Sequence, residues 1–277
     1  MEIKKIIRAG NTEIVLCFMR YLDSIGVEYD PFKKREFINH AYVSSGYFDQ
    51  LVKGNPFEIP SPLEHFLDRW KKSLMGSELI VLKDSVYNIR KICAGEENNF
   101  YNHLGLSGIQ DNHNFGFKDL CILTQGARIM VVSSFADLMK IQHESESLKR
   151  IRPHFKPSGV IFYKFPYLFG NKQYDNSLEA VEQLYEDLEV KSHGLDAVVM
   201  SCGCYGAVLA DKFFGRGLNA YYVGGDLQIF FGIMGNRWRS SIESQDDFQK
   251  QKEHWILKIA NELVPPEANQ IEGACYW

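Results

Sequence analysis

Acidic, amide and basic side chains occur together in residues 8–13, which read RAGNTE and follow a predicted short strand at 2–7. The free N–H groups at the start of a helix bind phosphate. Carbonyl and carboxylate oxygens are the ligands that Mg²⁺ or Mn²⁺ prefers. The spacing of Asn11 and Glu13 therefore predicts a phosphate and metal site. The alternative is structural: Asn11 caps a helix, and Glu13 stabilises the helix dipole.

A second segment, residues 200–206, reads MSCGCYG and joins a predicted strand to a predicted helix. Gly203 and Gly206, which flank Tyr205, allow a backbone to approach a ligand closely. The pattern is looser than the G-x-G-x-x-G fingerprint of dinucleotide-binding proteins. An ordinary strand-to-helix turn, with small residues that serve packing, is the alternative.

The third segment combines YVGGDLQ at 222–228 with FGIMGNRW at 231–238. A guanidinium such as that of Arg237 binds phosphate through two hydrogen bonds. The ring of Trp238 stacks on a base or on a sugar face. The density of glycine, glutamine, arginine and tryptophan favours a binding site over a buried tryptophan beside a surface arginine. Residues 133–135, SSF, follow another predicted strand and form a weaker candidate.

These segments need a scaffold, and the apolar pattern predicts one. Strands are expected at 2–7, 78–82, 128–132, 159–163, 196–200 and 220–223, and helices at 11–25, 31–40, 62–74, 86–93, 136–147, 177–188 and 205–214. Strands that alternate with helices indicate a parallel sheet, in which ligands bind beyond the carboxyl ends of the strands. We therefore expect one Rossmann-like α/β domain over residues 1–277. A polar stretch at 94–117 predicts an irregular insertion over the site, and 265–277 an irregular tail.

On these segments the chain resembles the GT-D type of glycosyltransferase, in the GT-D-like group of surface-polysaccharide biosynthesis. Residues 8–13 are similar to its Arg-x-Gly-Asp-x-Glu stretch, and 203–206 to its Gly-Ala-Tyr-Gly turn. Residues 224–238 carry the most specific match, and 272–277 also fit. Residues 130–135, followed by Gln142, stand where the group has a strand and a His-Pro-Phe loop. The chain departs from the group at Asn11, in place of Asp, and at 133–134, in place of His-Pro.

The resemblance implies sugar transfer from a nucleotide-sugar donor to an acceptor hydroxyl in surface glycan biosynthesis. Glu13 and Asp226 are the candidate catalytic residues, and Asn11 and Glu13 the candidate ligands of Mn²⁺ or Mg²⁺. The residues expected to bind the donor are Arg8, Gly10, Asn11, Ser133, Gly203, Tyr205, Gly206, Gly224, Gly225, Gln228, Arg237 and Trp238. Asn11 also favours an alternative, a non-catalytic nucleotide-sugar-binding module. A Rossmann-type oxidoreductase is disfavoured because the dinucleotide fingerprint is missing.

The composition limits the partners and the compartment. A net charge of −4 gives no sign of a nucleic-acid partner. Six scattered cysteines, several of them within apolar runs, predict buried thiols in a reducing compartment. No apolar stretch has the length of a signal peptide's core or of a bilayer span. We therefore expect a cytoplasmic enzyme that acts on a glycan or lipid-linked acceptor and is able to associate with a membrane surface.

Overall fold

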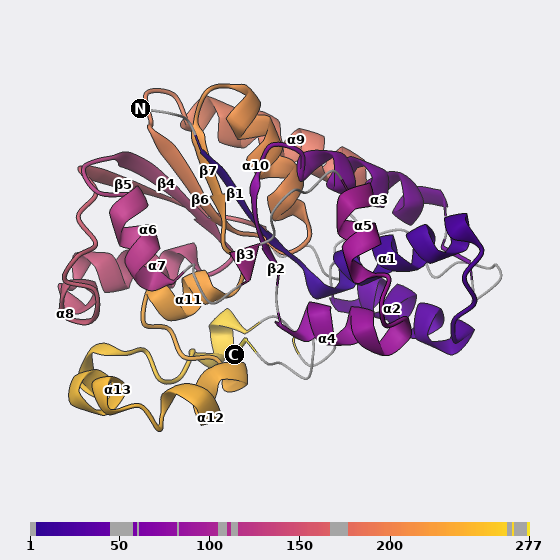
Figure 1. Ribbon diagram of the computed structural model, residues 1–277. Coiled ribbons are helices and arrows are strands. Elements are labelled where there is room, and N and C mark those ends of the chain that lie inside the picture. The colour runs from indigo at the N-terminus through magenta and orange to yellow at the C-terminus, as the bar shows by residue number, and fades with distance from the viewer. Residues whose placement is uncertain are drawn as a thin grey trace.

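The computed structural model describes residues 4–44, 58–59, 61–81, 83–104, 110–111, 116–166, 177–264, 268 and 276–277. Within them, seven parallel strands form one sheet in the order β3-β2-β1-β7-β6-β4-β5 (Figure 1). The strands are β1 (Lys5–Ala9), β2 (Glu78–Val81), β3 (Gln110–Asp111), β4 (Arg128–Ser133), β5 (Gly159–Lys164), β6 (Ala197–Ser201) and β7 (Asn219–Tyr222). The predicted parallel α/β sheet is confirmed.

Helices connect these strands and follow the apolar periodicity of the sequence. The α-helices are α1 (Asn11–Ile25), α2 (Pro31–Ser44), α3 (Ser61–Ser73), α4 (Lys83–Ile92), α5 (Glu97–His103), α6 (Phe117–Leu123), α7 (Ala136–Glu144), α8 (Ser147–Ile151), α9 (Ser177–Lys191), α10 (Tyr205–Gly215), α11 (Asp226–Phe230), α12 (Arg239–Ile242) and α13 (Asp246–Gln251). Short 3₁₀ turns follow at η1 (Asn236–Trp238), η2 (Lys252–His254) and η3 (Asn261–Leu263). Helix α1 ends where Gly26 takes a left-handed conformation, with φ of 70°, because glycine adopts it without steric cost.

The two faces of the sheet bury separate cores. In β6, Val198 and Met200 face one core, whereas Ala197 and Val199 face the other. This alternation is the two-residue period of a strand that is buried on both sides. Helices α1, α3, α9 and α10 supply the first core, and α7, α8 and α11 supply the second. Helix α1, which follows β1, therefore packs on one face of the sheet, and α11, which follows β7, packs on the other, which matters for the site below.

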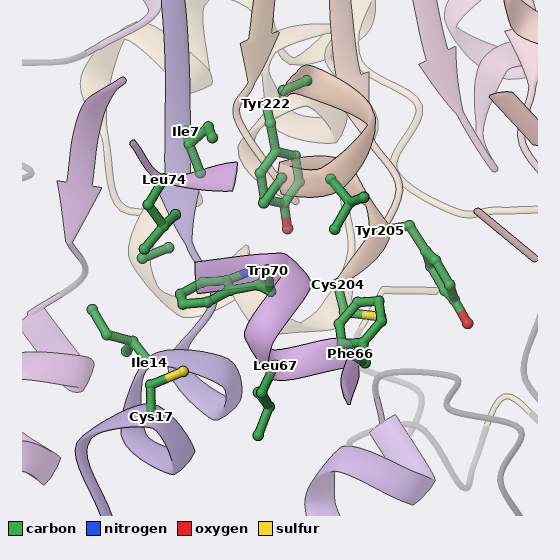
Figure 2. Packing of buried hydrophobic residues seen from close by; sticks show 14 of the residues in the cluster. Ile7, Ile14, Cys17, Phe66, Leu67, Trp70, Leu74, Cys204, Tyr205 and Tyr222 are labelled. Atoms are coloured by element: carbon green, nitrogen blue, oxygen red, sulfur yellow. The ribbon is translucent and has the colours of Figure 1, made fainter. Parts of the chain in front are cut away.

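The first core centres on Trp70 of α3, which is fully buried. Figure 2 shows its ring between Ile14 of α1 and Tyr222 of β7, with Cys17 close by. Burial raises the pKa of the Cys17 thiol to about 12, so this cysteine is an apolar packing residue. Four of the five cysteines that the structure describes are buried, and all five are free.

Two predictions about the elements are corrected. The stretch at 94–117, expected to be irregular, holds helix α5 and the short edge strand β3, although residues 105–109 and 112–115 lie outside the described part. Helix α5 forms because Phe100 is buried and packs edge-on against Phe18, with ring centroids 5.1 Å apart. The helix predicted at 136–147 is divided into α7 and α8, since Glu146 takes a left-handed φ of 65° between them.

Of the tail at 265–277, the structure describes Ala268, Tyr276 and Trp277. Among the described helices, none has both the length and the apolar character that crossing a bilayer requires.

Candidate functional site

Strands β1 and β7 are neighbours in the middle of the sheet, with Ile7 paired to Tyr222. The chain leaves β1 into α1 on the first face and leaves β7 into α11 on the second face. In open parallel sheets, ligands bind at such a point, where adjacent connections diverge. The pairing therefore brings two of the predicted segments, residues 8–13 and 222–228, to the same end of the sheet.

Arg8 spans the gap between these two strands. Its Nη1 donates to the carbonyl of Val223 at 3.3 Å and lies 3.6 Å from the carboxylate of Asp226. Its Nε is buried and has no hydrogen-bond partner. Buried donors are nearly always satisfied, so an unmade bond here marks a place where an acceptor is missing.

Gly224 is required beside that arginine. Its φ is 63°, and a Cβ atom there would stand 2.7 Å from Arg8 Nη1. Both the backbone conformation and the contact exclude a side chain. The glycine predicted to admit a diphosphate thus admits the Arg8 guanidinium.

Glu13 lies on the opposite side of β1, in the first turn of α1, and is buried. It folds back over Gly10, where a Cβ atom would meet Glu13 Oε2 at 2.0 Å. Burial chiefly raises the pKa of Tyr222 well above its usual value; the Glu13 carboxylate adds to that rise and Arg8 opposes it.

The predicted metal ligands do not form a metal site by themselves. The Oδ1 atom of Asn11 accepts a hydrogen bond from Asn88 of α4 at 3.2 Å. No group of three or more His, Cys, Asp or Glu side chains suited to a metal occurs in the described part of the chain. Asn11 and Glu13 would thus need further ligands from a bound donor.

Residues after β7 gather around Tyr276, which sequence reasoning placed in a motif but not in the site. Gln228 Nε2 donates to the Tyr276 carbonyl, and Arg237 Nη1 to its hydroxyl, both at 2.8 Å. Trp238 packs edge-on against the Tyr276 ring, with centroids 5.7 Å apart. A Cβ atom on Gly225 would lie 3.2 Å from Trp238. The most specific part of the predicted site therefore holds the tail of the chain.

The turn before α10 and the end of β4 have packing roles in this structure. A Cβ atom on Gly206 would stand 2.1 Å from the ring of Tyr222, so this glycine lets α10 lie against β7. Tyr205 is 2 % exposed and packs edge-on against Phe66. Gly203 provides the left-handed turn with φ of 56°. Ser133 is buried, and its hydroxyl accepts the Phe135 N–H at 3.1 Å.

A cavity of about 500 Å³ lies at the carboxyl ends of β4 and β5. Its walls come from the start of α7, from the residues after β5, from η3 and its neighbours, and from Trp277. None of the residues predicted to bind the donor lines it, although Ser134 and Phe135 of the weaker candidate segment do. The structure thus has two regions of interest at one edge of the sheet.

Comparison of the chain with protein-family models, with curated proteins and with solved structures finds no match. The function is therefore argued from the geometry of these two regions.

Proposed function

We propose that this protein transfers a sugar from a nucleotide-sugar donor to an acceptor hydroxyl in surface glycan biosynthesis, with the donor bound where β1 and β7 end. One observation carries the proposal: Arg8, a partly buried arginine whose buried Nε has no hydrogen-bond partner, lies at the carboxyl edge of a parallel sheet, where α1 begins with Glu13 in its first turn and α11 begins with Asp226. Arginine is suited to a diphosphate because its planar donors match phosphate oxygens. The resemblance of residues 8–13 and 224–238 to a glycosyltransferase group supports the same ligand.

The proposed reaction needs positive charge and one base from the chain. The acceptor oxygen bonds to the anomeric carbon, while the bond from that carbon to the phosphate oxygen breaks. The nucleotide leaves with the bonding electrons, as a nucleoside diphosphate or, from a CMP-sugar, as CMP, and Arg8 and Arg237 offset its charge. A carboxylate takes the acceptor proton. Asp226, with 43 % of its side chain exposed, is open to an acceptor, whereas Glu13 is buried.

A non-catalytic nucleotide-sugar-binding module is the second candidate. The observation that favours it is the hydrogen bond from Asn88 to Asn11, which occupies an oxygen that a metal would need. Metal involvement, with Asn11 and Glu13 as partial ligands, is therefore a variable in the experiment and has no part in the reaction proposed above.

The test is a thermal-shift screen of the full chain against UDP-, GDP-, CMP- and dTDP-sugars, with and without Mn²⁺. A ligand at a hundred times its dissociation constant stabilises the folded state by about 2.7 kcal/mol. We expect a shift with one donor and its loss in Arg8→Gln and Glu13→Gln. Arg216→Gln is the matched control. Arg216 is a surface residue just after the end of α10, where it forms an ion pair with Glu189 of α9.

The outcomes separate the two candidates. Donor binding with release of the nucleoside diphosphate, or of CMP from a CMP-sugar, supports the transferase. Donor binding without release, in the presence of Mn²⁺ and a panel of acceptors, supports the module. If no donor produces a shift, or if Arg8→Gln keeps the full shift, the proposed donor site is wrong.

A further inference from the structure

The cavity at the ends of β4 and β5 has a mixed lining. Phe135, Leu138, Phe165 and Trp277 contribute apolar surface, together with Leu263 at the end of η3 and Val264 after it. Charged groups, Asp137, Lys164 and Glu262, stand among them. Its volume, about 500 Å³, falls in the range of small-molecule sites in proteins.

The aromatic part of the lining presents two inclined rings. The Phe135 and Trp277 ring centroids are 6.1 Å apart, with 49° between the ring planes. Both side chains are partly exposed, so part of their surface is open to a ligand. Aromatic faces pack well against the apolar C–H faces of a sugar ring, because the ring offers a large rigid surface with little conformational entropy to lose.

The charged groups favour a neutral ligand that is rich in hydroxyls. Lys164 Nζ lies 2.7 Å from Asp137 Oδ2, so the cation of the cavity is already paired. A phosphate or carboxylate ligand would have to compete with Asp137 for it. A hydroxyl donates to a carboxylate and accepts from an ammonium group, so it joins the pair without separating it. A purely apolar ligand would make no hydrogen bond with Asp137 or Lys164.

The cavity is connected to the proposed donor site through the last two residues of the sequence. Tyr276 contacts Gln228 and Arg237, and its ring lies 6.0 Å from that of Trp277, which lines the cavity. Figure 1 shows the C-terminal end of the chain beside α11, the helix that begins at Asp226. The two regions therefore share one edge of the sheet and one segment of chain.

We propose that this cavity binds the sugar unit of the acceptor, with its ring against Trp277 and Phe135 and its hydroxyls on Asp137 and Lys164. This inference rests on the proposed function and deepens it, since it assigns the acceptor as a saccharide and gives it a place.

The experiment measures saccharide binding to the full chain by saturation-transfer NMR, in the absence of any donor. The probes are methyl glycosides of glucose, galactose and mannose, methyl glycosides of the two N-acetylhexosamines, and octanol as a purely apolar probe. We expect at least one glycoside to bind, and Trp277→Ala to weaken it by at least about tenfold. Trp277→Phe should restore most of the binding, because it keeps an aromatic face.

Three further variants test whether the glycoside binds in this cavity. Leu263→Trp should fill the cavity from an exposed position and block the glycoside, even if Trp277→Ala folds poorly. Phe32→Ala, which removes an exposed aromatic ring from α2 outside the cavity, should leave glycoside binding unchanged. Arg8→Gln should also leave it unchanged while abolishing donor binding.

The failure of each proposal has its own signature. If no glycoside binds, if only octanol binds, or if binding survives both Trp277→Ala and Leu263→Trp, the acceptor site is wrong whatever the donor does. If a glycoside binds in the cavity and no nucleotide-sugar binds anywhere, the proposed function fails, and the cavity is a saccharide site without a donor.

Discussion

Strand β1 carries a basic side chain near each end, and the two are treated in opposite ways. Lys5, at the amino end, is buried and donates to the carbonyls of Ser73 and Met75 and to the carboxylate of Asp211, at 2.9, 2.6 and 2.7 Å. All three donors of its ammonium group are used. Arg69 binds the other oxygen of Asp211 at 3.0 Å, so the carboxylate is satisfied as well.

Arg8, toward the carboxyl end, is arranged differently. Its two contacts are long, at 3.3 and 3.6 Å, and its buried Nε has no partner. Burying a donor without a partner in this way costs stability unless a ligand completes the hydrogen bond. The two ends of one strand therefore differ: the amino end has all the donors of its lysine satisfied, whereas the carboxyl end has a buried donor without a partner, as the proposed donor site requires.

The largest expected effect on stability is at the amino end. Lys5→Met should lower the free energy of unfolding by about 3 kcal/mol, because it leaves two carbonyls and one oxygen of Asp211 without their donor. Chemical denaturation measures this loss. Lys4→Met is the control, since Lys4 pairs with Glu78 on the exposed surface and should lose less than about 1 kcal/mol. Equal losses in the two variants would show that Lys5 is no more important than a surface lysine.

A loss of stability of intermediate size is expected at Gly10. Gly10→Ala places a Cβ atom 2.0 Å from the Glu13 carboxylate and displaces that side chain, at a cost of about 1 kcal/mol. Donor binding should fall as it does in Glu13→Gln. Gly215→Ala is the control, because no atom lies within 4 Å of its added Cβ. Unchanged donor binding in Gly10→Ala would mean that the position of Glu13 is irrelevant to the ligand.

The smallest effect on stability is expected at Asp226. Asp226→Asn removes the charge from a partly exposed ion pair and should change the free energy of unfolding by less than about 1 kcal/mol. If Asp226 is the base, the rate of sugar transfer should nevertheless fall by about 100-fold or more. Stability comes from denaturation, and the rate from nucleoside diphosphate release. A large loss of stability would contradict the view that this end of β1 contributes little to the fold.

The sequence predicted most of the elements, because most buried strands contain an apolar run and most helices show a clear apolar stripe. The prediction failed where packing overrides composition: α5 is polar along most of its length and forms because Phe100 enters the core. The order of the strands could not be predicted from the sequence either. The pairing of β1 with β7, which brings Arg8 and Asp226 together, was therefore not predicted.

Roles within the candidate site were harder to predict than its location. The sequence does not distinguish a glycine that faces a ligand from one that faces a side chain. In the structure, Gly206 faces the Tyr222 ring, and Gly224 faces Arg8. Gln228 was predicted to bind the donor through its amide, but its amide nitrogen donates a hydrogen bond to the Tyr276 carbonyl. These partners lie between 16 and 216 positions away in the chain, so no local pattern contains them.

The contacts of Tyr276 and Trp277 have a thermodynamic consequence. Tyr276 is held by residues of the proposed donor site, and Trp277 forms a wall of the cavity. A ligand that fixes one of these side chains restricts the other, because they are adjacent in the chain. The second ligand then loses less conformational entropy on binding. Such coupling is reciprocal: the factor by which a nucleotide-sugar raises the affinity for a saccharide equals the factor by which the saccharide raises the affinity for the nucleotide-sugar.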